Sequence, residues 1–494
     1  MKAKGEIFPR MLFGWTLACA VAVAIGSAAV GATGAGVAAG TASEAASDCD
    51  LVPRGYAGFA YRNPTQAERD SLALTLREGI DLEDRGAKGP SDLKEPSPGG
   101  VVVTQVVRGS AADSAGLAAG DLLVRYCGED IPDNSTLAGL ARLRYAGDTA
   151  RADFVRTGKQ MTADMVLAPA PRESAADLTT EYTCFESGRT RLRAVVTSPA
   201  ASGDRRLPAL LLVSALASPR LVATPGYAAW RDLAHTITRS GFRVLRFELR
   251  GSGDSEGEDY RDTGFYDEVA DNLAALDYLT AREDVDPSKV FVMGHSTGGM
   301  IAAVMASRRE LAGLVTSSTI GRTFCERALE TLRLQSELGG DSPPTTDAKL
   351  KQYLDLMTAA ARGDSLAVII ERSPALAQYV NADGRLMDDR NLAYWREQLN
   401  LNLPETYAKV SEPVLVVYGA SDFLTSLACH EHIRDVLRAA GNLDVTLAVV
   451  PETDHAYAFA KDKRESYTNY QTRDFRANPE PARLIARWLA DHAR

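Results

Sequence analysis

The sequence has no excess of basic residues. Its 494 residues include 55 Lys and Arg against 65 Asp and Glu, which gives a formal net charge of −10 at pH 7. No long local run of Lys or Arg offsets this acidic balance. Proteins that bind nucleic acid neutralise its phosphates with a basic surface, so the composition excludes nucleic acid as a partner.

Cysteine is also scarce, with six residues and no CxxC pair. A zinc site or a thiol redox motif is therefore not expected, and we predict no metal and no cofactor. Cys19 lies in the apolar N-terminal segment, and its removal would leave five cysteines. An odd count means at least one free thiol unless one pairs between chains, and we assign no disulfide pairing. The remaining five are Cys49, Cys127, Cys184, Cys325 and Cys429.

Histidine is rare too, and His430 and His432 form its densest cluster among six residues. Helix positions i and i+2 point about 200° apart, whereas two ligands of one metal need i, i+4 spacing. We therefore interpret these two histidines as part of a solvated helix face.

Charge is missing altogether between Met11 and Ser43, and Lys2, Lys4 and Arg10 precede this stretch. A basic segment followed by an apolar one is typical of an export signal. We predict that residues 1–46 are a signal peptide or an uncleaved N-terminal anchor, and that the protein is exported to the periplasm or beyond. Membrane contact is expected only through an uncleaved segment. The overall composition, 45% hydrophobic and 24% charged, is otherwise that of a globular protein.

Residues 51–168 have a compact, β-rich pattern. A strand is predicted at 101–107, and the segments 108–117 and 118–128 that follow it contain an AGLxxGD sequence. This succession of strand, short helix, GD turn and second strand resembles a bacterial-type PDZ domain, with residues 134–145 as its groove helix. The resemblance implies capture of a peptide end at a sheet edge, and the alternative is a module that only docks onto the rest of the protein.

The peptide carboxylate would bind in a backbone loop of this domain, and two segments are candidates. One is Gly55–Phe59 and the other is Glu78–Asp81. The sequence does not choose between them.

After a Pro/Ala linker at 168–172, strands and helices alternate through residues 173–494. Such alternation predicts a mostly parallel sheet with helices on both faces, an α/β fold. A helical insertion at about 320–410 separates the sixth strand from the seventh. The eight predicted strands are 182–185, 192–197, 209–213, 242–248, 290–293, 314–316, 414–418 and 445–450.

The sequence Gly294-His-Ser-Thr-Gly298 follows an apolar strand and opens a helix. A GxSxG motif in this context is a nucleophile elbow, in which Ser296 sits on a strained turn and the glycines allow the strand and helix to approach. An ordinary strand-to-helix turn is the weaker alternative. We predict that Ser296 is the nucleophile of a serine hydrolase.

A serine hydroxyl needs a base, and the base needs an orienting acid, in the chain order Ser, acid, His for this elbow. Asp422 follows the seventh predicted strand and His455 follows the eighth. We assign them as acid and base. The alternatives are that Asp422 caps the next helix and that His455 is a surface residue. Asp454 adjoins His455, so its side chain diverges from the imidazole and cannot orient it.

Together, these motifs resemble an α/β-hydrolase of the esterase, lipase and aminopeptidase type. Residues 249–257 match its RGxGxSxG loop. The resemblance implies an oxyanion hole made by the backbone N–H of Thr297 and that of Leu216, with Ala215 as the alternative donor. A phosphate-binding glycine loop is excluded, because acidic residues intervene before the next helix.

The sequence motifs do not identify the substrate directly. We favour carboxylic esters cleaved through an acyl-enzyme, with the insertion at 320–410 acting as a cap over a small-molecule site. A serine aminopeptidase or oligopeptidase that binds peptides at its PDZ domain is the second hypothesis, and a peptide-binding scaffold is the third. Candidate pocket residues in the cap are Tyr353, Leu354, Met357, Leu366, Tyr379 and Trp395.

Overall fold

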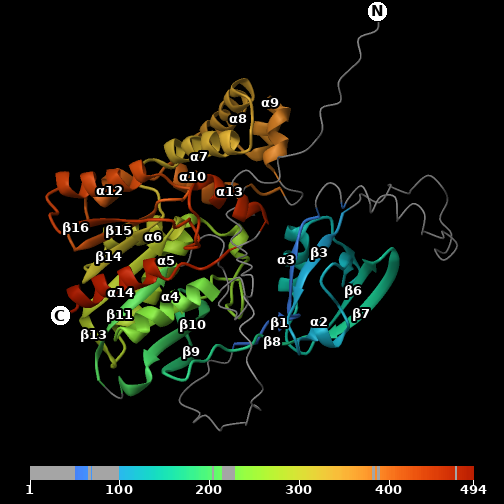
Figure 1. The fold of residues 1–494 in the computed structure, drawn as a ribbon, viewed down its shortest axis with the longest axis horizontal. Coiled ribbons are helices and arrows are strands. Elements are labelled where there is room, and N and C mark those ends of the chain that lie inside the picture. The colour runs from blue at the N-terminus through green and yellow to red at the C-terminus, as the bar shows by residue number, and fades with distance from the viewer. Residues whose placement is uncertain are drawn as a thin grey trace, which may run out of the picture. The chain divides into compact units, whose positions relative to one another are not determined.

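The computed structural model describes residues 51–64, 68, 99–202, 205–213, 228–380, 384–386, 390–472 and 475–494. Within them the chain divides into two compact units, residues 52–171 and residues 172–494 (Figure 1). The predicted signal segment, 1–46, lies outside the described residues. No helix in the described ranges is long and apolar enough to cross a membrane.

In its described residues, the first unit has a six-stranded sheet, a separate two-stranded sheet and two short helices. The strands of the six-stranded sheet run in the order β2-β3-β4-β6-β7, and β5 pairs with β4. The elements are β1 (Gly55–Tyr56), β2 (Phe59–Arg62), β3 (Val101–Val106), α2 (Ala111–Ser114), β4 (Leu122–Tyr126), β5 (Glu129–Asp130), α3 (Asn134–Arg142), β6 (Thr149–Arg156), β7 (Lys159–Val166) and β8 (Ala168–Pro169).

The AGLxxGD sequence owes its shape to Asp121, which is almost fully buried. One carboxylate oxygen accepts a hydrogen bond from the backbone N–H of Ala118 at 2.7 Å, and both oxygens pair with the Arg156 guanidinium at 2.6 and 2.7 Å. A buried carboxylate needs such partners, so the turn before β4 is fixed to the end of β6. The predicted linker is partly strand, because Ala168 and Pro169 pair with Tyr56 and Gly55.

The second unit contains an eight-stranded sheet in the order β16-β15-β14-β13-β11-β12-β10-β9, which confirms the predicted α/β-hydrolase sheet. Only the pairs of β10 with β9 and β12 are antiparallel. The strands are β9 (Leu178–Ser187), β10 (Thr190–Pro199), β11 (Leu207–Val213), β12 (Arg243–Phe247), β13 (Val285–His295), β14 (Gly313–Ser317), β15 (Val414–Gly419) and β16 (Val445–Val450).

Helices cover both faces of this sheet because its strands alternate their apolar side chains. In β11, Leu210 and Leu212 pack with α4 and α14, whereas Leu211 and Val213 join the larger core with α5 and α6. Every residue of α6 is buried, as expected for a helix without a polar face. The covering helices are α4 (Ala228–Arg239), α5 (Phe265–Thr280), α6 (Thr297–Ala306), α12 (Leu427–Ala439) and α14 (Glu480–His492). A further helix, α13 (Lys463–Thr472), lies against the helical insertion instead.

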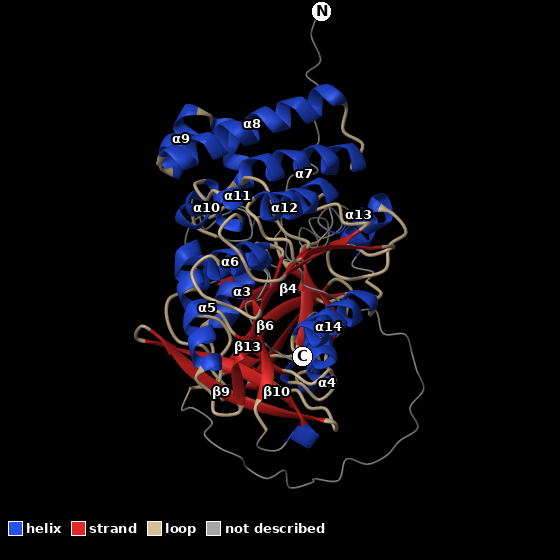
Figure 2. Cartoon of the chain, turned by 90° about the vertical axis from the view of Figure 1, so that its left-hand side faces the viewer, coloured by secondary structure: helices blue, strands red, loops and turns tan. Residues whose placement is uncertain are grey.

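The insertion between β14 and β15 is helical. Figure 2 shows α7, α8 and α9 stacked above α10, α11 and α12. The polar helix α13 was not predicted from the sequence, since it buries only Ser466 and Tyr470 and has no apolar stripe. The insertion comprises α7 (Phe324–Leu338), α8 (Pro343–Arg362), α9 (Leu366–Arg372), the 3₁₀ turn Pro374–Tyr379, α10 (Leu392–Leu399) and α11 (Leu403–Tyr407).

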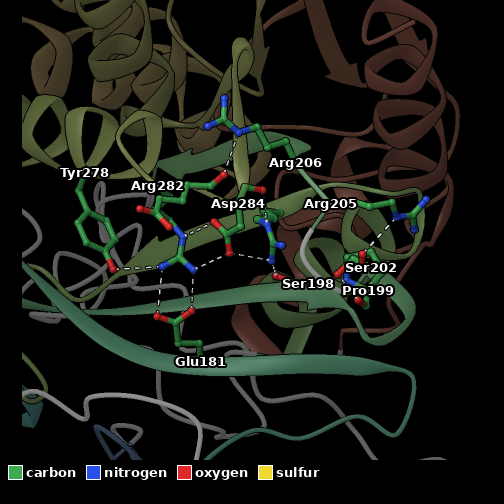
Figure 3. Close-up of polar contacts among 11 residues, drawn as sticks. Glu181, Ser198, Pro199, Ser202, Arg205, Arg206, Tyr278, Arg282 and Asp284 are labelled. Atoms are coloured by element: carbon green, nitrogen blue, oxygen red, sulfur yellow. Dashed lines mark hydrogen bonds and ion pairs between the residues drawn. The ribbon is translucent and has the colours of Figure 1, made fainter.

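An ion-pair network holds the sheet at the ends where β12 and β13 begin (Figure 3). Arg282 pairs with Glu181 of β9 at 2.8 Å and with Asp284 at 2.9 Å, and Asp284 lies 3.2 Å from Arg243 of β12. Burial opposes the charge of Arg282, but the two carboxylates outweigh it and raise its pKa. The network therefore stabilises the end of the sheet opposite His295 and Ser296.

The first residues of the second unit are anchored by a buried carboxylate. Glu173 pairs with the Arg246 guanidinium of β12, its backbone N–H donates to the Tyr182 hydroxyl at 2.7 Å, and His235 lies 3.8 Å away. Burial opposes ionisation of Glu173, but His235 and Arg246 together lower its pKa from 4.5 to about 2. Glu173 is therefore charged in the folded protein.

We predict that replacing Glu173 with Gln lowers the free energy of unfolding at pH 7 by about 3 kcal/mol, because Arg246 loses its buried partner. A lowered carboxyl pKa stabilises the fold above pH 4.5, and this contribution disappears as the pH falls toward 2. The difference in the free energy of unfolding between wild type and Glu173→Gln should therefore become smaller in acid. Urea unfolding at pH 7 and pH 4 measures this difference. A larger difference at pH 4 would contradict a charged Glu173 in the folded protein.

Candidate active site

Ser296 lies between β13 and α6 in a strained backbone conformation, with φ 53° and ψ −126°. Non-glycine residues adopt such angles at a cost of about 1–3 kcal/mol, and surrounding contacts must hold them there. A Cβ on Gly294 would lie 2.1 Å from the carbonyl oxygen of Gly298, and one on Gly299 would lie 2.3 Å from Thr319 Oγ1. Only glycine fits at both positions, so the structure has the elbow geometry that the motif predicts.

Asp422 follows β15 and is fully buried. Its Oδ1 accepts hydrogen bonds from the backbone N–H groups of Leu424 and Thr425 at 2.7 and 3.0 Å, and its Oδ2 accepts from Thr425 Oγ1 at 2.6 Å. Burial opposes ionisation, but His455 and these donors hold the pKa of Asp422 far below its ordinary value. The N-cap of α12 is Ser426. The alternative prediction, that Asp422 merely caps this helix, is therefore wrong.

His455 follows β16 and is 1% exposed, so it is not a surface histidine. Its Nδ1 lies 2.8 Å from Asp422 Oδ2. An ionised carboxylate can only accept, so Nδ1 carries the proton and donates it, which leaves Nε2 free of a proton in the neutral ring. The structure therefore brings Asp422 and His455 together from the ends of neighbouring strands.

Asp454 shapes the loop that presents His455. Its Oδ1 accepts hydrogen bonds from the backbone N–H groups of Ala456 and Ala458 at 2.9 and 2.8 Å. Burial raises the pKa of Asp454 to about 7, and the nearby charge of Asp422 adds to the rise. These hydrogen bonds hold the loop, and the carboxylate bonded to His455 is that of Asp422.

Aromatic rings pack beside the two histidines. The ring centroid of His295 lies 4.9 Å from that of His455, 5.1 Å from Tyr457 and 4.8 Å from Trp230 of α4. Burial lowers the pKa of His295 well below its ordinary value, and His455 lowers it further. His295 is therefore neutral near neutral pH and adds no charge beside His455.

The prediction that His430 lies on a solvated helix face is wrong, because its side chain is fully buried. Its Nε2 accepts a hydrogen bond from the backbone N–H of Thr319 at 3.1 Å, and its Nδ1 lies 2.7 Å from the carbonyl oxygen of Ser426. Spacing could have revealed this, since His430 precedes the buried Ile433 and Leu437 by three and seven positions. His432 is only half-buried, so the interpretation is wrong for one residue of the pair.

The predicted oxyanion donors are placed only in part. Thr297 is the first residue of α6, directly after Ser296, as the prediction requires. Leu216 and Ala215 lie outside the described residues. Two backbone N–H groups of the loop at 249–257 form hydrogen bonds within the protein. That of Gly251 donates to the carbonyl oxygen of Glu256 at 2.8 Å, and that of Asp254 donates to Glu248 Oε2 at 2.6 Å.

Most cap residues proposed as pocket residues belong to the apolar core. Tyr353, Met357, Tyr379 and Trp395 are at most 8% exposed and pack in the main cluster of the second unit. Leu366 packs against that cluster, while Leu354 is 41% exposed and faces solvent.

The described part of the chain contains no group of three or more metal-ligating side chains. Its four cysteines, Cys127, Cys184, Cys325 and Cys429, are all free thiols. In the first unit, which holds the predicted PDZ domain and is called the PDZ unit below, Gly55–Phe59 spans β1 and the start of β2, which lies at a sheet edge. The second candidate carboxylate loop, Glu78–Asp81, lies outside the described residues.

Residues 226–462 match the protein family described as serine aminopeptidase, S33. Proteases of the HtrA and DegP type match the region that contains the PDZ domain. The serine protease Do-like HtrA of Lactococcus lactis is 36% identical over 110 residues, which are 22% of this chain and 26% of that protein. A probable periplasmic serine endoprotease, DegP-like, of Hahella chejuensis is 37% identical over 76 residues, 15% of this chain and 16% of that protein.

The chain thus spans about a quarter or less of the length of these two relatives. Among solved structures, Est1E of Butyrivibrio proteoclasticus is similar over 63% of this chain and 96% of its own, at 14% identity and a TM-score of 0.38. A structural similarity this low gives no information about the substrate of this chain.

Proposed function

We propose that this chain, an α/β-hydrolase with an N-terminal PDZ domain, hydrolyses carboxylic esters through an acyl-enzyme formed on Ser296. The observation that carries the proposal is the buried hydrogen bond of 2.8 Å between His455 Nδ1 and Asp422 Oδ2. This pair and the strained Ser296 all follow the carboxyl ends of strands in one sheet, where open α/β sheets place their chemistry.

In the proposed mechanism, His455 Nε2 takes the proton of the Ser296 hydroxyl while Oγ attacks the ester carbonyl carbon. Asp422 remains ionised and stabilises the imidazolium that forms. Collapse of the tetrahedral intermediate releases the alcohol, which receives the proton from His455. A water molecule, deprotonated by the same histidine, then attacks the acyl-enzyme and releases the carboxylic acid.

We further propose that the intermediate oxyanion is held by the backbone N–H of Thr297 and that of Leu216. Thr297 begins α6, and the backbone N–H groups of a helix N-terminus favour negative charge.

Assay of the full chain on p-nitrophenyl esters of increasing acyl length, beside aminoacyl-anilides, tests the ester proposal. We expect turnover of at least one ester and slower turnover of the anilides. Faster turnover of the anilides would replace the ester hydrolase with a peptidase, and no turnover of either class would favour the peptide-binding scaffold.

A serine aminopeptidase or oligopeptidase is the second candidate, favoured by the description of the matching family. The edge position of β2 supports peptide binding in the PDZ unit, because an extended peptide can add to a sheet edge as a further strand.

Removal of residues 1–171 separates these candidates. The remaining chain of roughly 320 residues can bury about 75% of its unfolded surface, so we expect it to fold and to retain its kcat on small esters. It also keeps Glu173, the buried anchor of this unit. If the PDZ unit delivers peptides, KM for a peptide should rise with little change in kcat, because the lost contacts bind ground and transition states alike.

The measurement is kcat and KM for one ester and one peptide, on the full and the shortened chain. Unchanged kinetics on both substrates would mean that the PDZ unit only docks or anchors. Equal loss of kcat on both would contradict separable units and mean that the PDZ unit completes the active site.

We also propose that the protein is exported. The basic and then uncharged N-terminal segment supports this, as does the similarity to a DegP-like protease described as periplasmic. Fractionation of cells that express the full chain tests it, and recovery of the uncut chain in the cytoplasm would contradict it.

A further inference from the structure

The main chain of Ser296 is held on both sides by one short segment, residues 317–319. The backbone N–H of Ser296 donates to the carbonyl oxygen of Ser317 at 2.9 Å. The hydroxyl of Thr319 donates to the carbonyl oxygen of Ser296 at 2.6 Å. This segment, which begins at the last residue of β14 and which we name the elbow brace, therefore contacts both backbone polar groups of the proposed nucleophile.

The elbow brace is itself strained. Ser318 has a φ of 45°, and its side chain is fully buried. Its hydroxyl has no hydrogen-bond partner among the described residues, and its backbone N–H donates to the carbonyl oxygen of Val417 at 2.9 Å. A strained turn with a buried, unsatisfied hydroxyl persists only where neighbouring groups over-determine it. Something must therefore hold the brace in place.

His430 is one of the groups that hold it. The ring lies between the brace and its own helix, with Nε2 accepting from the N–H of Thr319 and Nδ1 2.7 Å from the carbonyl oxygen of Ser426. Both hydrogen bonds form only in the neutral tautomer that carries its proton on Nδ1. A proton on Nε2 would face the N–H of Thr319 with a second donor.

The surroundings favour that neutral ring. The ring of Tyr418 packs against it with centroids 4.8 Å apart, and burial lowers the pKa of His430 to about 4. At the other end of the brace, the hydroxyls of Ser317 and Tyr457 form a hydrogen bond. The brace is thus anchored to α12, which follows Asp422, and to the loop that presents His455.

We propose that His430 is a positioning residue, whose neutral imidazole anchors Thr319 and thereby fixes the main chain of Ser296 in its strained conformation. The inference rests on the proposed function, since it gives His430 a task only if Ser296 is the nucleophile. Because its ring is fully buried, His430 acts on the reaction only through Thr319, whose hydroxyl donates to the carbonyl group of Ser296.

The test compares His430→Leu with variants that keep one hydrogen bond each. A glutamine amide reaches toward the position of Nε2 and can still accept from Thr319, whereas an asparagine amide lies nearer that of Nδ1 and can still donate to Ser426. We expect kcat on a p-nitrophenyl ester to fall about 10²-fold in His430→Leu, as for a small misplacement of a reacting group, with KM nearly unchanged. His430→Gln should retain more of kcat than His430→Asn.

Thr319 provides the second arm. Thr319→Val removes the hydroxyl bonded to Ser296 and should lower kcat to a similar extent, while Thr319→Ser should stay near wild type. Because both residues act through one chain of contacts, combining His430→Leu with Thr319→Val should cost no more than the larger single effect. His432→Leu, a half-buried neighbour on the same helix, is the matched control and should leave kcat unchanged.

Titration with a fluorophosphonate corrects every kcat for the fraction of folded, reactive protein. A purely structural role would lower that fraction and the melting temperature but leave kcat per reactive site at the wild-type value, and this result in both His430→Leu and Thr319→Val would overturn the proposal. If His430→Leu does not fold, Thr319→Val and the Gln and Asn pair decide the question. If Ser296→Ala retains activity, the proposed function fails as well, whereas an inactive Ser296→Ala beside unaffected His430 variants would overturn the positioning role alone.

Discussion

Replacing Ser296 with alanine is expected to lower kcat on a small ester by about 10⁶-fold, the loss seen when a serine nucleophile is removed and chemistry limits the rate. The variant should also fail to react with a fluorophosphonate. Alanine removes only the hydroxyl, and the strained φ of 53° remains, so the fold should be kept. The measurement is kcat together with the extent of labelling.

Ser318→Ala is a matched control for this experiment. Ser318 is also a buried serine with a φ of 45°, and its hydroxyl has no hydrogen-bond partner among the described residues. Removal of the Ser318 hydroxyl should leave labelling by the fluorophosphonate intact. Labelling of Ser296→Ala at the wild-type rate would place the nucleophile elsewhere and remove the basis of the proposed function.

Replacing Asp422 with Asn should lower kcat by about 10⁴-fold, although the side chain keeps its size. The Oδ1 of Asp422 accepts two backbone N–H groups, so an asparagine would direct its oxygen to them. Its NH₂ group would then occupy the place of Oδ2 and face His455 Nδ1. This arrangement favours the wrong tautomer of His455, with the proton on Nε2, and a ring in that state cannot accept the serine proton.

Thr425→Val is the control for the second experiment, because it removes one hydrogen bond to Oδ2 and leaves the carboxylate and its bond to His455 in place. Its kcat should fall far less than that of Asp422→Asn. The comparison is made on kcat at neutral pH, with thermal unfolding to confirm that both variants fold. Near-normal kcat in Asp422→Asn would mean that a different acid orients the base.

The positions of Ser296, Asp422 and His455 could be predicted because each follows an apolar run that is recognisable by itself. Local periodicity identifies a strand, and strands of one parallel sheet end at a common edge. No knowledge of the partner strand is needed for this step. The structure shows in addition that β15 and β16 are neighbours in the sheet. Their proximity brings His455 Nδ1 to 2.8 Å from Asp422 Oδ2.

The environment of individual side chains was harder to predict. The sequence placed His430 on a solvated face, yet its ring is buried by β15 and by the brace, which lies more than 100 residues earlier in the chain. Likewise, Glu173 follows a Pro/Ala stretch that resembles a flexible linker, but Arg246 draws its carboxylate into the interior. In both cases the deciding partner is far away in the sequence.

The sequence by itself therefore determined the α/β-hydrolase sheet and the strand ends at which the proposed nucleophile, acid and base lie, because these follow from local patterns of apolar residues, glycine and polar side chains. Only the tertiary structure decided which polar groups support that site: the elbow brace beside Ser296, the tautomer of His430 and the four hydrogen bonds on the Asp422 carboxylate. The physical reason is that a hydrogen bond depends on distance and direction within tenths of an ångström, and these are set by the packing of strands and helices far apart in the chain.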